Sequence, residues 1–353
     1  MFSLCCPRLV ELPSPSKGRV GWPWTEDSAL LPASMPDGRP WPSISIVTPS
    51  YNQGRFLEET IRSVLLQGYP NLEYSVVDGG SSDCSVDIIH KYERWLTRWV
   101  SERDYGQGDA LRKGFRSSNG CLFGWINSDD LLAPGALEAV AFAAALHPEY
   151  GIYAGTVEDF NSDSFGADHK IVRQQNISLV NLILPDPRRR AIYHQPGIFF
   201  TSRLYRASGG INPRYYYRMD YDLLLRMLDN GGRLWYLGKT LAYFRIHPIS
   251  KTGASHGKLA TLSDTEGYEI ARRYAGRLSE GDRKKLRLQY LQDLVHGAYL
   301  GFMEGHLEGA GSSIRLAVRE GRLDVLRAFT RFIARGILTR LENSLQSSES
   351  TTS

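Results

Sequence analysis

Short apolar segments alternate with helical patterns along the first half of this chain, and this alternation constrains its fold more than any other feature. The apolar segments predict strands at Ile44 to Thr48, Leu72 to Val77, near Trp99 and Cys121 to Ile126. The helical patterns predict helices at Arg55 to Leu66, Ser85 to Trp95, Asp109 to Arg116 and Pro134 to Leu146. Such alternation with short connections is typical of an α/β fold, in which a mostly parallel sheet carries helices on both faces.

The rest of the chain is organised differently. After Tyr150 we predict one helix, Asp220 to Asp229, and short strands at Gly151 to Val157, Ile171 to Arg173, Gly197 to Thr201, Arg233 to Leu237 and Leu241 to Ile246. The pattern after Gly257 is wholly helical. Residues 7 to 43 show neither the hydrophobic period of a helix nor that of a strand. We therefore expect a loosely ordered leader (1–42), a catalytic domain (43–256), a helical region (257–341) and a disordered tail (342–353).

Composition excludes several classes of protein. Lys and Arg together number 42 against 38 for Asp and Glu, which is not the strongly basic balance of a nucleic-acid-binding protein. The four cysteines form no CxxC pair and no Cys/His cluster, so neither a zinc site nor a disulfide framework is indicated. No apolar run reaches the length of about eighteen residues that spans a bilayer. The start of the chain lacks the basic and apolar regions of a signal peptide, so we expect a cytoplasmic protein.

Polar residues follow three of the predicted strands at the point where each strand ends. In an open α/β sheet, ligands bind outside these carboxyl ends. Ser50, Tyr51 and Asn52 offer hydrogen bonds and an aromatic surface to a base or a sugar. Asp78 ends the second strand, and the glycines after it permit a close approach of the backbone to a ligand. Asp83, further along that loop, fits a helix cap as well as it fits a ligand contact.

The adjacent carboxylates of Asp129 and Asp130 follow the strand Cys121 to Ile126. Two neighbouring carboxylates repel each other, and a divalent cation relieves this repulsion. Hard oxygen ligands suit Mg²⁺ or Mn²⁺ that bridges to phosphates. The alternative is an ordinary turn, because the sequence SDD is common in turns.

Taken together, these motifs resemble the family 2 glycosyltransferases of the GT-A fold, over roughly Ser43 to Thr252. Six segments in the same order carry the resemblance: TPSYNQGRFLEETIRSVLLQGYPNLEYSVVDGGSSD, DYGQGDALRKGF, WINSDD, HQPGIFF, MDYDLLLRM and YFRIHPISKT. The resemblance implies a GT-A sheet with an appended helical region. It also implies a transferase that uses a nucleotide-diphosphate sugar.

The resemblance assigns roles to matching positions. Pro49, Tyr51 and Asp78 would line the nucleotide pocket, together with Ser50, Asn52 and Gly79. Asn127, Ser128 and Asp129 take the place of the DxD motif, so that Asp129 would bind Mn²⁺ or Mg²⁺ with Asp130 beside it. Asn127 replaces the first aspartate of that motif, which is expected to weaken metal binding. Gln107 and Asp109 would lie near the donor sugar, and Arg112 near phosphate.

Two further motifs supply the remaining candidates. Asp220 occupies the position of the catalytic base, with Asp222 as its rival two residues on. A first-turn aspartate also suits the helix dipole, which is the structural alternative for Asp220. His247 lies near Arg245 and Lys251 in a group suited to a diphosphate, whereas His194 is more often a structural histidine.

The predicted reaction is an inverting transfer from a UDP-, GDP- or dTDP-sugar to a glycan or lipid-linked acceptor, in polysaccharide, lipopolysaccharide or glycolipid assembly. A sugar nucleotidyltransferase would need a glycine-rich basic loop after the first strand, and a processive synthase would need membrane spans. The alternative is a catalytically weak nucleotide-sugar-binding or scaffold protein, which donor hydrolysis would distinguish from an enzyme.

The segment Leu323 to Leu341 has an apolar face and an arginine-rich face. Packing on the catalytic domain is the simpler interpretation. The alternative is peripheral contact with the anionic inner face of the cell membrane.

Overall fold

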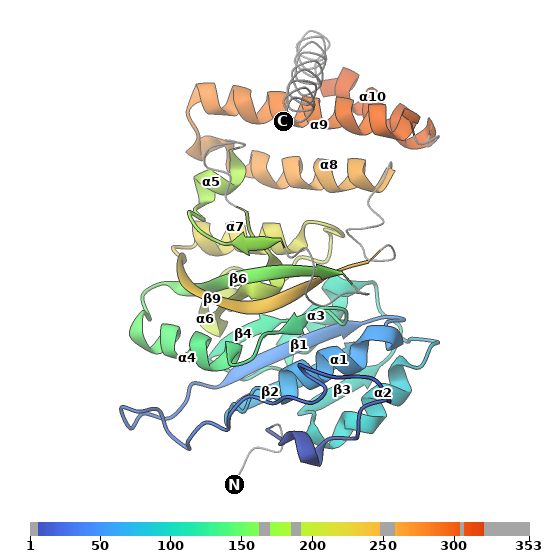
Figure 1. The fold of residues 1–353 in the computed structure, drawn as a ribbon. Helices are drawn as coiled ribbons and strands as arrows, with labels where there is room; N and C mark the ends of the chain where they lie inside the picture. The colour runs from blue at the N-terminus through green and yellow to red at the C-terminus, as the bar shows by residue number, and fades with distance from the viewer. Residues whose placement is uncertain (1–5, 162–169, 185–191, 248–257, 304–306, 321–353) are drawn as a thin grey trace, which may run out of the picture. The chain divides into compact units, whose positions relative to one another are not determined.

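A computed structural model describes residues 6–161, 170–184, 192–247, 258–303 and 307–320 (Figure 1). The chain divides into two compact units. The first comprises residues 1–182 and 191–247, and the second comprises residues 183–190 and 248–353. Every sequence-predicted site residue belongs to the first unit.

One nine-stranded sheet organises the first unit, in the order β3-β2-β1-β4-β8-β6-β9-β5, with β7 paired to β6. The strands are β1 (Ile44–Ser50), β2 (Leu72–Asp78), β3 (Arg98–Ser101), β4 (Leu122–Trp125), β5 (Leu131–Leu132), β6 (Gly151–Asn161), β7 (Ile171–Arg173), β8 (Ile198–Thr201) and β9 (Arg233–Ile246). The first four strands are parallel, as predicted, and β8 runs antiparallel between β4 and β6. The prediction of a mostly parallel α/β sheet flanked by helices is confirmed.

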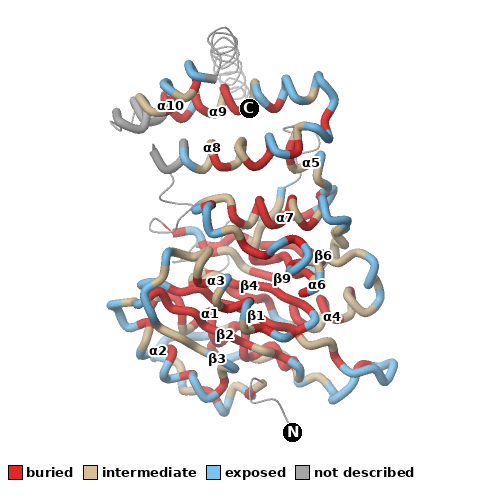
Figure 2. The backbone as a smooth tube through the Cα atoms, turned by 180° about the vertical axis from the view of Figure 1, so that it is seen from behind, coloured by how far each residue is buried: buried red, intermediate tan, exposed pale blue. Residues whose placement is uncertain are grey.

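Helices cover both faces of this sheet. The helices between β1 and β9 are α1 (Gly54–Leu65), α2 (Ser85–Tyr92), α3 (Gln107–Arg116), α4 (Ala136–Leu146), α5 (Leu179–Ile183), α6 (Ser202–Ala207) and α7 (Met219–Asp229). Ile44 and Ile46 of β1 share a core cluster with α1, α2 and α4. Val47 points to the opposite face of the sheet. There its side chain packs against Gly114 of α3, where a Cβ would collide with Val47 Cγ1. All seven residues of β1 are therefore buried, as Figure 2 shows.

Short or bent elements differ from the sequence prediction. β9 is one strand where two were expected, because its pairing with β6 continues past a register shift at Thr156. Gly238, with φ of +71°, lies in the extra residues of this bulge, which separates the two strands that we predicted. β5, α5 and α6 were not predicted. Elements this short contain too few repeats of the hydrophobic period of a strand or a helix to be recognised.

The described part of the leader contains little regular structure and is hydrogen-bonded to later elements of the first unit. Over residues 6–42 it forms one 3₁₀ turn, Leu9–Glu11. Trp22 is buried and its Nε1 donates to Leu132 O at 2.9 Å. The fully buried Arg62 of α1 donates to three leader carbonyls, those of Pro13, Pro23 and Trp24. These hydrogen bonds hold the leader in place although it contains little regular secondary structure.

The second unit is helical where it is described. It contains α8 (Lys258–Arg273), α9 (Glu280–Met303) and α10 (Leu307–Glu320). Tyr268 of α8 stacks on Tyr290 of α9 with the ring centroids 4.0 Å apart, next to a small core. The helix predicted at 323–341 and the tail at 342–353 lie outside the described residues. None of the helices in the described ranges combines the length and apolarity needed to cross a membrane.

Candidate active site

The carboxyl ends of β1, β2 and β4 meet at one edge of the sheet, as predicted. Ser50 pairs with Asp78 in the register of β1 and β2, and Gly79 N donates to Ser50 O at 2.8 Å. Pro49 is buried one step earlier in β1. The loops that follow these strands therefore begin side by side.

Asp78 organises the loop after β2. Its side chain is fully buried and accepts four hydrogen bonds. The donors are Gly80 N (3.1 Å), Ser81 N (2.8 Å), Ser81 Oγ (2.5 Å) and Ser101 Oγ (2.7 Å). Gly79 lies against Asp104, since a Cβ there would come within 2.9 Å of Asp104 Oδ2. The carboxylate of Asp78 thus shapes the loop, and its contact with a nucleotide stays a prediction.

The loops after β1 and β2 are tied to each other. Asn52 adopts the left-handed conformation, its N donates to Ser81 Oγ at 2.7 Å, and its Oδ1 accepts from Ser82 N at 2.9 Å. Asp83 accepts from Gly54 N and Ser85 N, at the starts of α1 and α2. These contacts favour the structural interpretation of Asp83. Tyr51 stays 62% exposed beside them.

The two carboxylates after β4 have different environments. Asp130 is 1% exposed, and its oxygens accept from Arg245 N (3.0 Å) and Asn127 Nδ2 (3.2 Å). Burial, followed by the charge of Asp129, raises the pKa of Asp130 well above its usual value. The Asp129 side chain is 19% exposed. The hydrogen bonds of Asp130 hold this turn together, and metal binding by Asp129 with Asp130 beside it stays a prediction.

Asn127 and Ser128 complete this turn. The Asn127 Oδ1 accepts from Gln107 Nε2 at 2.7 Å, while its Nδ2 donates to Asp130, so both ends of the amide have partners in the chain. Ser128 is buried. The turn is thereby joined to the first residue of α3.

Arg245 of β9 holds the same turn from the other side. Its Nε donates to Asp129 O at 2.8 Å, and its Nη2 pairs with Glu59 Oε2 of α1 at 2.9 Å. The guanidinium is 4.8 Å from the ring centre of Phe56 and 4.4 Å from that of Phe160. With the Arg245 and Glu59 side chains 4% and 10% exposed, this is a buried ion pair.

His247 lies against Asp129, a pairing that sequence spacing did not predict. Its Nε2 is 3.1 Å from Asp129 Oδ2, and its ring packs 4.6 Å from that of Phe56. Its Nδ1 is buried and has no hydrogen-bond partner among the described residues. A carboxylate oxygen and an imidazole nitrogen are therefore presented together at the end of β4.

The other α3 candidates lie apart from this turn. Asp109 lies 3.4 Å from Lys113, which also pairs with Glu102 at 2.9 Å. Arg112 is exposed, and its charge acts on Tyr205 of α6, whose pKa is raised chiefly by burial. Of the three α3 residues predicted to bind the donor, Gln107 alone contacts Asn127 by a described hydrogen bond.

Asp220 and Asp222 have separate environments in the first turn of α7. Asp220 is half-buried, and its Oδ1 accepts from Tyr221 N at 2.8 Å. Asp222 is fully buried and forms an ion pair with Arg226 at 2.6 Å. The rival carboxylate is thus committed to a structural pair.

A half-buried histidine and a buried acid near Asp220 form a further pair. His194 Nδ1 lies 3.8 Å from Asp159 Oδ1. Burial lowers the pKa of His194 and raises that of Asp159, and the charge of Asp220 also acts on His194. Sequence reasoning missed Asp159 as well as Gln195, whose Nε2 donates to Trp125 O at 2.8 Å. The HQ pair in HQPGIFF was the available signal for Gln195.

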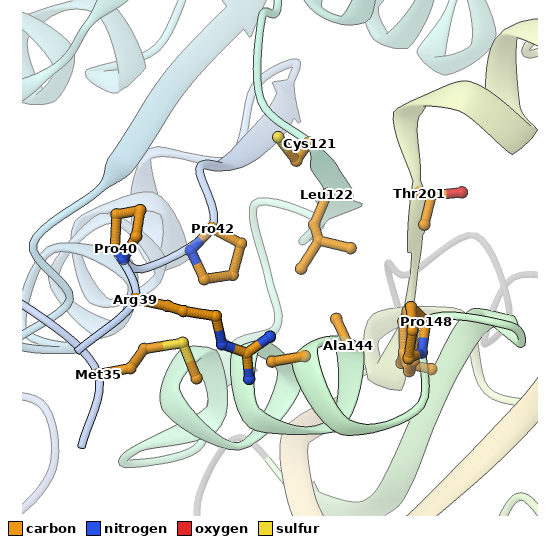
Figure 3. Close-up of a pocket in the computed structure, with 11 residues that line it drawn as sticks. Met35, Arg39, Pro40, Pro42, Cys121, Leu122, Ala144, Pro148 and Thr201 are labelled. Atoms are coloured by element: carbon orange, nitrogen blue, oxygen red, sulfur yellow. The ribbon is translucent and has the colours of Figure 1, made fainter. Parts of the chain in front are cut away.

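A hollow at the opposite end of the strands contains none of these residues. It has a volume of about 260 Å³ and lies at the start of β4, between Leu122, Pro40, Pro42 and Ala144 (Figure 3). Cys121 and Arg39 also line it. The polar convergence therefore lies at the carboxyl edge and not at this hollow.

Comparison with known proteins agrees with the fold and the motifs. Residues 45–208 match the family described as Glycosyl transferase family 2. An uncharacterized glycosyltransferase of Rickettsia typhi is 26% identical, with 85% of this chain and 91% of the relative covered. Chondroitin synthase of Escherichia coli is 25% identical over 54% of this chain and 27% of its own length.

Two solved structures share the fold. S. aureus TarS 1–349 in complex with UDP-GlcNAc aligns with a TM-score of 0.55 at 15% identity, covering 80% of this chain and 82% of that one. The mannosyltransferase PcManGT from Pyrobaculum calidifontis, in complex with GDP-Man and Mn²⁺, aligns at 0.51 and 17% identity, covering 88% of each chain. Over residues 45–208, with its motifs in order on this sheet, the chain therefore matches glycosyltransferase family 2, and it shares the fold of these two solved structures.

Proposed function

We propose that this protein is a metal-dependent, inverting hexosyltransferase. It moves a sugar from a nucleotide-diphosphate donor to a hydroxyl of a glycan or lipid-linked acceptor. The donors named for the two neighbouring structures, UDP-GlcNAc and GDP-Man, support this donor class. The relationship to chondroitin synthase supports a role in the assembly of polysaccharide, lipopolysaccharide or glycolipid.

The contact between Asp129 and His247 carries the proposal. An oxygen and a nitrogen ligand meet 3.1 Å apart at the end of β4, and the Asp129 side chain is partly accessible. Within the described ranges no group of three or more His, Cys, Asp or Glu residues is placed to hold a metal ion. Two protein ligands nevertheless suit a cation that takes its other ligands from diphosphate oxygens and water, as Mg²⁺ often does. The residues therefore fit Mn²⁺ or Mg²⁺.

When bound, the cation would stabilise negative charge on the leaving diphosphate. The contribution of the chain is to hold Asp129 in place beforehand. Asp130, Arg245 and Glu59 support the turn through buried hydrogen bonds and one ion pair. A site held in place by its neighbours needs less rearrangement when the donor arrives.

Asp220 is the proposed catalytic base. In an inverting displacement the acceptor hydroxyl attacks the anomeric carbon opposite the diphosphate, and a carboxylate takes its proton. Asp220 is half-buried at the start of α7, whereas the neighbouring Asp222 is fully buried. The greater accessibility of Asp220 supports it over its rival.

The test is donor turnover by the full-length chain. UDP-GlcNAc, GDP-mannose and dTDP-glucose are incubated with the protein, and sugar release or transfer is measured by mass spectrometry. Activity should vanish in EDTA, return with Mn²⁺ or Mg²⁺, and be lost in Asp129→Asn but not in Asp87→Asn, an exposed aspartate of α2. Undiminished turnover in the chelator contradicts metal dependence. Donor binding without any turnover would favour the scaffold alternative.

The proposed place of action is the cytoplasm. For residues 323–341, packing on the protein is our first interpretation, and docking on an anionic inner leaflet is the alternative. Sedimentation with anionic liposomes at low and high salt, for the full chain and a chain ending at Gly321, separates the two. If both forms stay in the supernatant at low salt, membrane docking through residues 323–341 is wrong.

A further inference from the structure

Three tyrosines of the first unit are more than half exposed, and all three belong to loops around the candidate site. Tyr51 follows β1 and is 62% exposed, Tyr105 follows β3 and is 95% exposed, and Tyr216 precedes α7 and is 52% exposed. Single exposed apolar residues are common on protein surfaces. Exposed aromatic rings gathered near one edge of a sheet instead indicate a binding surface.

Tyr105 and Tyr216 come from loops that lie against each other. A Cβ added to Gly106 would lie 3.9 Å from Tyr216 Cε2, so the Tyr216 ring lies beside the residue that follows Tyr105. A Cβ added to Gly108 would lie 3.2 Å from Pro213 Cα and 3.4 Å from Met219 Sδ. Residues 105–108 therefore lie against residues 213–219, immediately before Asp220.

The loop that carries Tyr105 is anchored on the nucleotide side of the site. Gly106 N donates to Asp104 Oδ1 at 2.8 Å, and the Asp104 carboxylate lies against Gly79 after β2. Tyr216 in turn packs edge-on against Tyr217, with the ring centroids 4.9 Å apart. Anchored loops thus present both rings to solvent.

We propose that Tyr105 and Tyr216 form a binding surface for a pyranose ring of the acceptor glycan. The inference rests on the proposed function, because it takes Asp220 as the base toward which the acceptor hydroxyl points. A tyrosine ring has an apolar face and a polar hydroxyl, which match the C–H face and the hydroxyl rim of a pyranose. The surface lies beside the start of α7. The proposed metal ligands are elsewhere, because His247 after β9 meets Asp129 in the turn after β4.

The test measures saccharide binding without requiring turnover. Methyl glycosides of glucose, mannose and N-acetylglucosamine are titrated into the full-length chain and followed by saturation-transfer NMR. We expect binding of at least one glycoside, weakened roughly tenfold by Tyr105→Ala or Tyr216→Ala and largely retained in Tyr216→Phe. Tyr299→Ala, at a tyrosine of α9 that is 44% exposed, is the matched control and should bind like the wild type.

Two results would overturn the proposal: no glycoside bound by the wild-type chain, or undiminished binding by the Tyr105→Ala/Tyr216→Ala double variant. Calorimetry with UDP and GDP tests the donor side separately, and both variants should retain the wild-type nucleotide affinity. If the wild-type chain binds a glycoside but neither UDP nor GDP, the proposed function is contradicted while the saccharide-binding surface is retained.

Discussion

The two ends of the parallel strands are built differently. At the carboxyl end, Asp78 and Asp130 are buried with their oxygens hydrogen-bonded, and exposed tyrosines surround them. At the amino end, prolines, Leu122 and Ala144 line an apolar hollow beside the exposed Cys121 (Figure 3). The hollow offers space with few polar groups, whereas the carboxyl edge offers convergent polar groups. The candidate site is therefore marked by hydrogen-bonded aspartates that converge at one edge, and not by the presence of a hollow.

Chain direction explains this difference. β1, β2 and β4 run parallel, so the loops that follow these strands all emerge at the same edge. Helix N-termini also lie on that side and favour negative charge. The amino end instead receives the segments that enter the strands, such as residues 39–42 before β1.

The largest expected effect comes from removing the proposed base at the carboxyl edge. Asp220→Asn should lower turnover roughly 10²–10⁴-fold, the usual contribution of a general base, while the melting temperature stays near that of the wild type. Kinetics and thermal unfolding are measured on the same samples. Asp222→Asn is the comparison variant: it should destabilise the fold because it breaks the buried pair with Arg226. Near-normal turnover in Asp220→Asn would remove Asp220 from the reaction.

A second variant tests whether the edge depends on its buried ion pair. Glu59→Gln leaves the Arg245 guanidinium without its carboxylate and should lower the free energy of unfolding by about 3–5 kcal/mol. Urea titration measures this loss. Asp37→Asn breaks an exposed pair with Arg39, and its effect on the free energy of unfolding should be much smaller because solvent screens that pair. Equal small losses in both variants would show that the turn is held by other contacts.

A smaller effect is expected at the exposed ring after β1. Tyr51→Ala should weaken UDP or GDP binding about tenfold, because stacking on an aromatic ring contributes on that scale for a nucleobase. Calorimetry measures the affinity, and Tyr51→Phe should keep most of it. An unchanged affinity in Tyr51→Ala would take this residue out of the nucleotide pocket.

The smallest effect is expected at the amino-end hollow. Cys121→Ala removes an exposed thiol. The Sγ of this thiol accepts a hydrogen bond from Ser43 Oγ at 3.4 Å. Turnover of the donor should therefore stay within about twofold of the wild type, a change of under 0.5 kcal/mol. A variant with strongly reduced turnover would break the proposed contrast between the two ends of the sheet.

Local pattern predicted much of the first unit. β1, β2 and α7 begin and end within a few residues of the sequence prediction, because continuous apolar runs and helical periods are local properties. The polar groups Ser50, Asp78 and Asp129 were likewise placed at one edge, since parallel strands share their direction. The sequence by itself therefore determined the fold class and the edge of the sheet where the candidate site lies.

Tertiary structure decided what each residue of that edge contacts. Asp129 and Asp130 are equivalent in sequence, yet one is partly exposed and the other is buried and hydrogen-bonded. His247 reaches Asp129 across 118 residues because β5 pairs antiparallel with β9, with Leu131 opposite Tyr243. Tyr216 likewise lies beside Gly106, although the two residues belong to loops that are far apart in the chain. Burial and long-range contacts depend on how whole elements pack, and no local pattern encodes that packing.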